Sequence, residues 1–323
     1  MSIAPYIKVI GRGKEGARSL NAEQAEDLMG RVLAGQVSDL ELGAFCLAMR
    51  IKGETPAELA GFLAATQVHC LAPRAATRSV WLPSYNGARK LPNLTPLLAL
   101  LLARKGVPVL LHGRQEEPGR VSSHQVCEAL GVPVAADAAA VEAAWRQGRL
   151  ALVHTESLCP PLASLLDVRR VVGLRNPGHT VAKLLHPLPA GAPGPGDFRV
   201  VSYTHPEYAD VLARFLAASA ADAMLLRGTE GEPVADARRM PRLDVFVAGG
   251  REEALGIAQR DGVLTQLPSL PGECDAAGTA AYISRVLAGE LAVPEPIARQ
   301  VGCILRALRQ PLCSAPRSHA KTA

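Results

Sequence analysis

Apolar positions in the first seventy residues follow a helical rhythm. Ala25, Leu28, Met29, Val32 and Leu33 recur at three- and four-residue spacing, which is typical of one buried helix face. Three segments, 21–24, 38–41 and 55–58, begin with Asn, Ser or Thr and end with Gln or Glu, the capping-box pattern of a helix start. Together these patterns predict a small helical domain at residues 1–73.

The spacing of apolar residues changes after Pro73. Short apolar runs predict strands at 80–82, 107–111, 150–154, 199–203, 223–226 and 243–247. Between and after them, helical spacing predicts helices at 95–105, 123–130, 138–147, 206–218, 276–288 and 294–308. Strands that alternate with helices indicate an α/β domain with a mostly parallel sheet, at residues 74–323.

Such a sheet also predicts where a ligand binds. Ligands of open parallel sheets lie beyond the carboxyl ends of the strands. Segments 84–90 and 112–120 each follow a predicted strand, so they are the candidate site. The Pro- and Gly-rich segment 187–196 is expected to be a loop or hinge.

Composition excludes several classes of protein. The 323 residues are 48% hydrophobic, which excludes a disordered chain. Aromatic residues are 4%, which argues against nucleic-acid binding mainly by base stacking. The longest apolar run, 97–103, is far shorter than the roughly 20 residues of a membrane span, so no membrane association is expected. The seven scattered cysteines contain no CxxC pair, so we expect reduced thiols, no structural metal and a cytoplasmic location.

Charge is distributed unevenly. The net charge of +5 combines an acidic span, 188–295, with basic regions before and after it. Segment 59–115 has seven basic residues and no acid, which favours a surface for phosphate groups. Basic faces that only contact solvent would give the same counts, so charge alone leaves both interpretations open.

Nine basic residues are candidates for phosphate contacts. Arg89 and Lys90 follow a predicted strand directly, and strand-end loops carry ligands in such folds. The other candidates lie farther along the chain, and several have a nearby acid that could pair with them. The full set is Arg89, Lys90, Arg114, Arg120, Arg175, Lys183, Arg238, Arg239 and Arg242.

Several segments resemble one known family. Val37-Ser38-Asp39, Lys52-Gly53-Glu54-Thr55 and Asn93-Leu-Thr-Pro are similar to motifs of the glycosyltransferase family that contains anthranilate phosphoribosyltransferase. The similarity is collinear over about residues 5 to 310. It implies a small helical domain on a large α/β domain, and a homodimer formed through the helical domains.

The catalytic motifs of that family are altered here. The Gly-Thr-Gly-Gly-Asp turn that cradles a diphosphate corresponds to Pro83-Ser84-Tyr85-Asn86-Gly87. The next phosphate motif survives in part as Asn93 and Thr95, and the Lys-His-Gly-Asn-Arg motif becomes Leu111-His112-Gly113-Arg114-Gln115. Proline and tyrosine cannot replace glycines whose N–H groups closely approach phosphate.

The magnesium motif is altered as well. Its adjacent Asp-Glu pair corresponds to Glu230 and Glu232, which are separated by one residue and follow Arg227. They are the candidates for a metal site, and a loop in which they form salt bridges with Arg227 is the other interpretation of the same residues. Since phosphoribosyl transfer depends on Mg²⁺ and on fixed donors for the leaving pyrophosphate, we expect this reaction to be absent or very weak. No catalytic residue is assigned.

Segments 85–90 and 227–232 resemble the YbiB-type branch of the family. That resemblance implies a nucleic-acid-binding protein, for DNA or RNA with low sequence specificity, and no cofactor. The alternative is an active phosphoribosyltransferase that uses phosphoribosyl pyrophosphate and Mg²⁺. Its site would be Asn93, Thr95, His112, Arg175, Glu230 and Glu232. A third hypothesis is a regulatory protein that binds a nucleotide or a protein partner in the same cleft.

Overall fold

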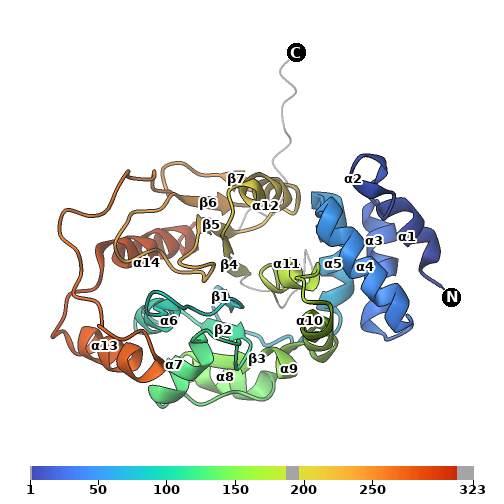
Figure 1. Cartoon of the computed structure of the whole chain (residues 1–323). Helices are drawn as coiled ribbons and strands as arrows, with labels where there is room; N and C mark the ends of the chain where they lie inside the picture. Colours follow the sequence, from blue (N-terminus) through green and yellow to red (C-terminus); the bar gives the residue numbers. More distant parts are fainter. Residues whose placement is uncertain (1, 187–195, 311–323) are drawn as a thin grey trace.

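The computed structural model describes residues 2–186 and 196–310. It consists of a helical domain beside a larger α/β domain (Figure 1). Most of the predicted loop at 187–196 lies outside the described residues.

The helical domain comprises α1 (Ala4–Ile10), α2 (Gly13–Gly16), α3 (Ala22–Leu33), α4 (Asp39–Lys52) and α5 (Pro56–Gln67). All three predicted capping boxes form, at the starts of α3, α4 and α5. Helix α5 packs closely on α3 at Gly61, which has no side chain. A Cβ at this position would lie 2.1 Å from the carbonyl oxygen of Ala22. Local caps and this glycine contact therefore set the form of the domain.

One sheet organises the α/β domain, with strand order β3-β2-β1-β4-β5-β6-β7. Its parallel part contains β1 (Ser79–Ser84), β2 (Val109–Gly113), β3 (Ala151–His154), β4 (Asp197–Tyr203) and β5 (Ala223–Arg227). The edge strands β6 (Leu243–Val247) and β7 (Gly250–Arg251) pair antiparallel. The expectation of a mostly parallel sheet is confirmed.

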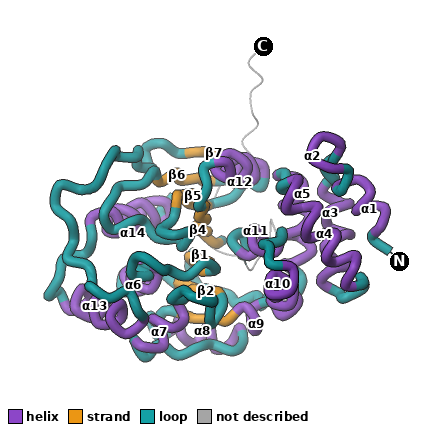
Figure 2. The backbone as a smooth tube through the Cα atoms, in the orientation of Figure 1, coloured by secondary structure: helices purple, strands orange, loops and turns teal. Residues whose placement is uncertain are grey.

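Helices lie on both sides of the strands (Figure 2). The sheet is accompanied by α6 (Thr95–Ala103), α7 (Ser123–Ala129), α8 (Ala138–Arg146), α9 (Thr155–Leu158), α10 (Pro160–Val172), α11 (Gly178–Ala182), α12 (Glu207–Ala218), α13 (Ala276–Ala288) and α14 (Glu295–Leu308). Alternate residues of β1 enter different cores. Val80 and Leu82 pack with α6, α13 and α14, whereas Trp81 belongs to the core shared with the helical domain.

The carboxyl ends of β1, β4 and β5 lie at the same edge of the sheet. Ser84 pairs with Gly113 at the end of β2, and Tyr203 of β4 pairs with Arg227 of β5. The loops that follow these strands therefore meet, and they carry most of the predicted site residues.

Candidate functional site

The turn after β1 binds a carboxylate of the protein itself. Oε1 of Glu232 accepts hydrogen bonds from the backbone N–H groups of Asn86 and Gly87, both at 2.8 Å. Oε2 accepts from the hydroxyl groups of Ser84, Thr95 and Ser123. Glu232 is 1% exposed. Its carboxylate therefore fills a buried anion site built from backbone and hydroxyl donors.

Glu230 fills a neighbouring site. Its carboxylate accepts from the backbone N–H groups of Arg89, Lys90 and Leu91, at 2.8, 2.7 and 3.1 Å. Glu230 has a φ of 51°, in the left-handed region that a glutamate rarely adopts. The tightly packed turn at 228–232 thus holds both carboxylates on N–H groups of the segment that follows β1.

Bound Mg²⁺ does not fit this arrangement. A metal needs oxygen lone pairs of its carboxylate ligands, but Glu232 already accepts five hydrogen bonds and Glu230 accepts three from backbone N–H groups. The described part of the chain contains no group of three or more His, Cys, Asp or Glu residues placed to hold a metal. Glu230 and Glu232 therefore act as internal anions that accept hydrogen bonds from the chain itself.

A hollow of about 740 Å³, which we call the basic groove, lies beside these carboxylates. It is lined by eight basic residues and by two acids, Glu230 and Asp236, among other residues. The basic residues come from loops that are far apart in the sequence: Arg89, Lys90, Arg120, Arg227, Arg238, Arg239, Arg242 and Arg260. Six of the nine predicted phosphate-contact residues thus lie around one hollow.

Ion pairs neutralise part of this charge. Arg238 pairs with Asp236 at 3.0 Å, and Arg242 pairs with Asp244 at 2.8 Å. In contrast, exposed Arg89, Lys90, Arg227 and Arg239 have no ion-pair partner within the residues that the structure describes. The basic groove therefore presents uncompensated positive charge to solvent.

A second hollow, of about 450 Å³, lies between the two domains, and we call it the interdomain cavity. Arg175 and Lys183, two further predicted residues, line it together with Arg50 and Arg169. Arg120, Tyr203, Thr204 and Glu230 line both hollows, so the interdomain cavity adjoins the basic groove.

Positive charges crowd one another in the interdomain cavity. Burial lowers the pKa of Arg175, and the nearby charge of Arg169 lowers it further. Burial and then Arg175 lower the pKa of Lys183 to about 8. The ammonium group of Lys183 donates to the carbonyl oxygens of Gly231 and Ser202, at 3.2 and 3.4 Å. An anion in the cavity would relieve this repulsion.

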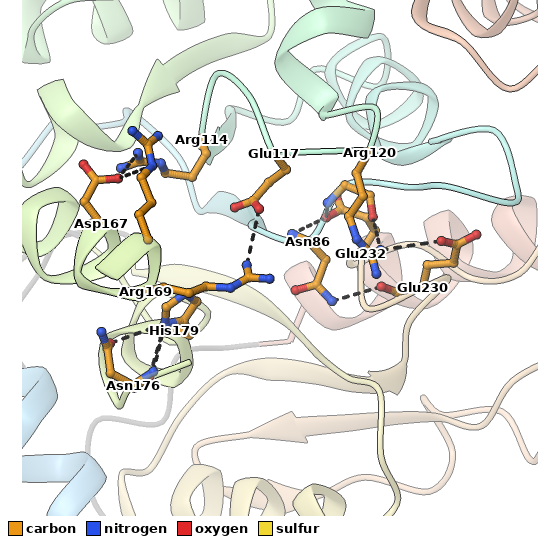
Figure 3. Close-up of polar contacts among 12 residues, drawn as sticks. Asn86, Arg114, Glu117, Arg120, Asp167, Arg169, Asn176, His179, Glu230 and Glu232 are labelled. Atoms are coloured by element: carbon orange, nitrogen blue, oxygen red, sulfur yellow. Dashed lines mark hydrogen bonds and ion pairs between the residues drawn. The ribbon is translucent and has the colours of Figure 1, made fainter. Parts of the chain in front are cut away.

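Arg114 lies apart from the basic groove, although it was predicted with the others. Its guanidinium group forms ion pairs with Glu156 at 2.9 Å and Asp167 at 2.7 Å, and its side chain is 8% exposed. Figure 3 shows Arg114 and Asp167 on the opposite side of Glu117 and Arg169 from the two glutamates. Its charge is therefore satisfied within the protein.

The residues that correspond to the family's cleft motifs make contacts within the protein. His112 is fully buried, and its Nδ1 lies 3.0 Å from the hydroxyl oxygen of Tyr85. Burial lowers the pKa of His112 to about 3. Asn93 donates to the carbonyl oxygen of Val121 at 3.1 Å and accepts from the N–H of Thr95 at 3.3 Å. Gly113 packs on the carbonyl oxygen of Ser84, where a Cβ would lie 1.8 Å away. These residues hold β1, β2 and α6 together.

Sequence reasoning missed four arginines of the two hollows, and one of them, Arg50, lies inside α4. Arg227 ends β5 and so stands at a strand carboxyl end, a signal that could have identified it. Arg260 and Arg169 had no such signal, since one lies in a long loop and the other inside α10.

Two family models match the chain. The helical bundle domain of a glycosyl transferase family matches residues 4–70, and the a/b domain of a glycosyl transferase family matches residues 87–288. Together they cover most of the described residues. In addition, no helix among the described residues is long and apolar enough to cross a membrane.

Individual relatives agree with these matches. The chain is 38% identical to the uncharacterized protein YbiB of Escherichia coli (strain K12), over 94% of each chain. It is 32% identical to an anthranilate phosphoribosyltransferase of Halobacterium salinarum, over 68% of this chain and 63% of that protein.

Solved structures show the same fold. The anthranilate phosphoribosyltransferase of Thermus thermophilus aligns with a TM-score of 0.68 at 23% identity, covering 94% of this chain and 96% of that one. The Saccharomyces cerevisiae enzyme, solved in complex with PRPP and Mg, aligns with a TM-score of 0.67 at 14% identity, covering 95% and 88%. At these identities the likeness concerns the fold alone.

Proposed function

Because the chain belongs to the glycosyl transferase family that includes the anthranilate phosphoribosyltransferases, we propose that it uses this scaffold to bind nucleic acid with low sequence specificity. The phosphate backbone of DNA or RNA would lie in the basic groove. The proposal separates scaffold from chemistry, since one fold can carry unrelated functions.

The convergence of basic side chains carries this proposal. Arg89 and Lys90 follow β1, Arg227 ends β5, and Arg238, Arg239 and Arg242 precede β6, yet all line one hollow. Contacts with phosphate do not depend on base sequence, so a groove of this kind would bind unrelated sequences alike. Low aromatic content agrees with binding through the backbone.

The alternative, an active phosphoribosyltransferase, is disfavoured by the two internal anions. The N–H groups of residues 86–87 and 89–91 already donate to Glu232 and Glu230. A diphosphate on the same donors would have to displace these carboxylates. The negative charge of the diphosphate would also be repelled by the negative charges of Glu230 and Glu232. The geometry thus opposes both diphosphate and metal binding.

We also propose that the chain is a homodimer. Helix α4 exposes Leu40, Leu47 and Ile51 by 84%, 46% and 59%, and their spacing places them on one face. A second copy covering this face would supply two basic grooves to one nucleic-acid chain and raise the avidity. Light scattering of the wild type and of Leu47→Glu tests this: the variant should be monomeric, and an unchanged mass would contradict the proposal.

A salt titration tests nucleic-acid binding. Affinity for several unrelated DNA and RNA oligonucleotides is measured by fluorescence anisotropy at about 50 and about 200 mM salt. We expect similar affinities across sequences and a loss of at least about tenfold at the higher salt, because released counterions drive the binding. Salt-independent binding, or no binding at the lower salt, would refute the proposed function.

A further inference from the structure

Two cysteine side chains meet where the helical domain joins the α/β domain. Cys70 follows α5, and Cys159 begins the turn into α10. Both sulfur atoms lie near one acceptor, the carbonyl oxygen of Thr66, at 3.4 Å for Cys70 and 3.8 Å for Cys159. The N–H of Leu71 donates to the carbonyl oxygen of Leu158 at 2.8 Å, which fixes the two segments side by side.

The two thiols also influence each other. The side-chain interaction between them lowers the pKa of Cys159 and raises that of Cys70. Cys159 is fully buried, whereas Cys70 is half-buried beside exposed Val68 and His69. A small oxidant can therefore approach the pair from the side of Cys70.

This setting differs from that of the other described cysteines. Cys46, Cys127 and Cys303 are buried, and burial raises the pKa of each thiol. Cys274 is half-buried, and its thiol donates to the carbonyl oxygen of Lys90. A thiol whose pKa is lowered and that lies beside a second thiol is the arrangement that favours reversible oxidation.

We propose that Cys70 and Cys159 form an oxidation site at which hydrogen peroxide converts the two thiols into a disulfide between the domains. The Cys159 thiolate attacks one peroxide oxygen, the O–O bond breaks, and the leaving hydroxide takes up a proton to become water. The resulting sulfenic acid is then attacked by the Cys70 sulfur, which loses its proton as a second water leaves. The two sulfurs together lose two electrons, and the peroxide gains them.

The disulfide would tie the two domains together. Residues 70 and 159 are far apart in the sequence, so the bond would close a long loop and restrict the unfolded chain. It would also hold α5 on α10, the helix that contributes Arg169 to the interdomain cavity. This inference stands independently of nucleic-acid binding, because it rests on the two thiols alone.

Peptide mass spectrometry tests the site. The folded full chain is treated with hydrogen peroxide, its free thiols are blocked with N-ethylmaleimide, and it is digested without reductant. We expect a linked peptide pair joining Cys70 to Cys159, lighter by two hydrogens than the sum of the two peptides and lost after dithiothreitol. The oxidised protein should unfold about 5 °C or more above the reduced protein.

Two variants control the experiment. Cys70→Ser removes the half-buried thiol and should abolish both the linked peptide and the thermal shift. Cys274→Ser removes a half-buried thiol outside the pair and should leave both unchanged. A wild-type protein in which peroxide gives no Cys70–Cys159 peptide, or gives cysteine sulfinic acid at either position instead, would overturn the proposal.

Discussion

The backbone N–H of Gly87 donates a hydrogen bond of 2.8 Å to Oε1 of Glu232. The two residues are far apart in the sequence, and the bond joins the turn after β1 to the turn after β5. An N–H nest that suits a phosphate is thus filled by a carboxylate of the same chain. The N–H donors of this turn are therefore satisfied within the protein.

Removal of the Glu232 charge should destabilise the protein. Glu232→Gln keeps the shape of the side chain but weakens the bonds from Asn86 and Gly87, because hydrogen bonds to charged groups are the stronger ones. We expect a loss of about 2 kcal/mol in the free energy of unfolding, measured by urea denaturation. Glu253→Gln, at an exposed position, should change it by less than about 0.5 kcal/mol. Equal stabilities of the two variants would contradict the internal-anion interpretation.

Transferase activity should be absent. With phosphoribosyl pyrophosphate, anthranilate and Mg²⁺, the fluorescence of anthranilate should fall no faster than in buffer, because Glu230 and Glu232 occupy the N–H groups that would receive the diphosphate. An anthranilate phosphoribosyltransferase under the same conditions is the positive control. Turnover that disappears in Glu232→Gln would show instead that the carboxylate serves the transferase reaction.

Lys183 should give stability a pH dependence. Burial lowers its pKa from 10.5 to about 8 in the folded protein, so between these values the unfolded chain holds a proton that the folded protein has released. Stability therefore rises with pH across this window. Urea denaturation at pH values from about 8 to 10.5 should show this rise in the wild type relative to Lys183→Met. Parallel curves for the two proteins would contradict the shifted pKa.

Local signals made much of the fold predictable. The capping boxes at 21–24, 38–41 and 55–58 each involve a contact across three residues, and all three form. The strand-end rule likewise indicated that Arg89 and Lys90 would lie at the carboxyl edge of the sheet. In both cases the physical cause lies within a few residues of the feature.

Long-range partners were not predictable in the same way. The ion pair of Arg114 with Asp167 and the hydrogen bonds of Glu232 with residues 86–87 join segments that only the folded chain brings together. The sequence shows Glu116 and Glu117 beside Arg114, but its acidic partners are Glu156 and Asp167. Charge counts therefore located a basic region without showing which of its charges are satisfied.

The chain offers a matched pair of variants for the basic groove. Arg89 and Lys90 are adjacent, exposed and line the groove. Arg104 and Lys105 are also adjacent and exposed, but they follow α6 and precede β2, at the amino end of the strand. The same double charge reversal can thus be made at the groove and away from it, with unfolding curves to confirm that both variants fold.

Binding of unrelated DNA and RNA sequences by these two variants is the most direct test of the proposed function. We predict that Arg89→Glu with Lys90→Glu lowers affinity at least about tenfold for every sequence. The slope of log affinity against log salt concentration should become shallower by about one to two. Arg104→Glu with Lys105→Glu should stay within about threefold of the wild type, since long-range repulsion is screened by salt. Equal losses in the two variants, or a loss confined to particular sequences, would contradict the account.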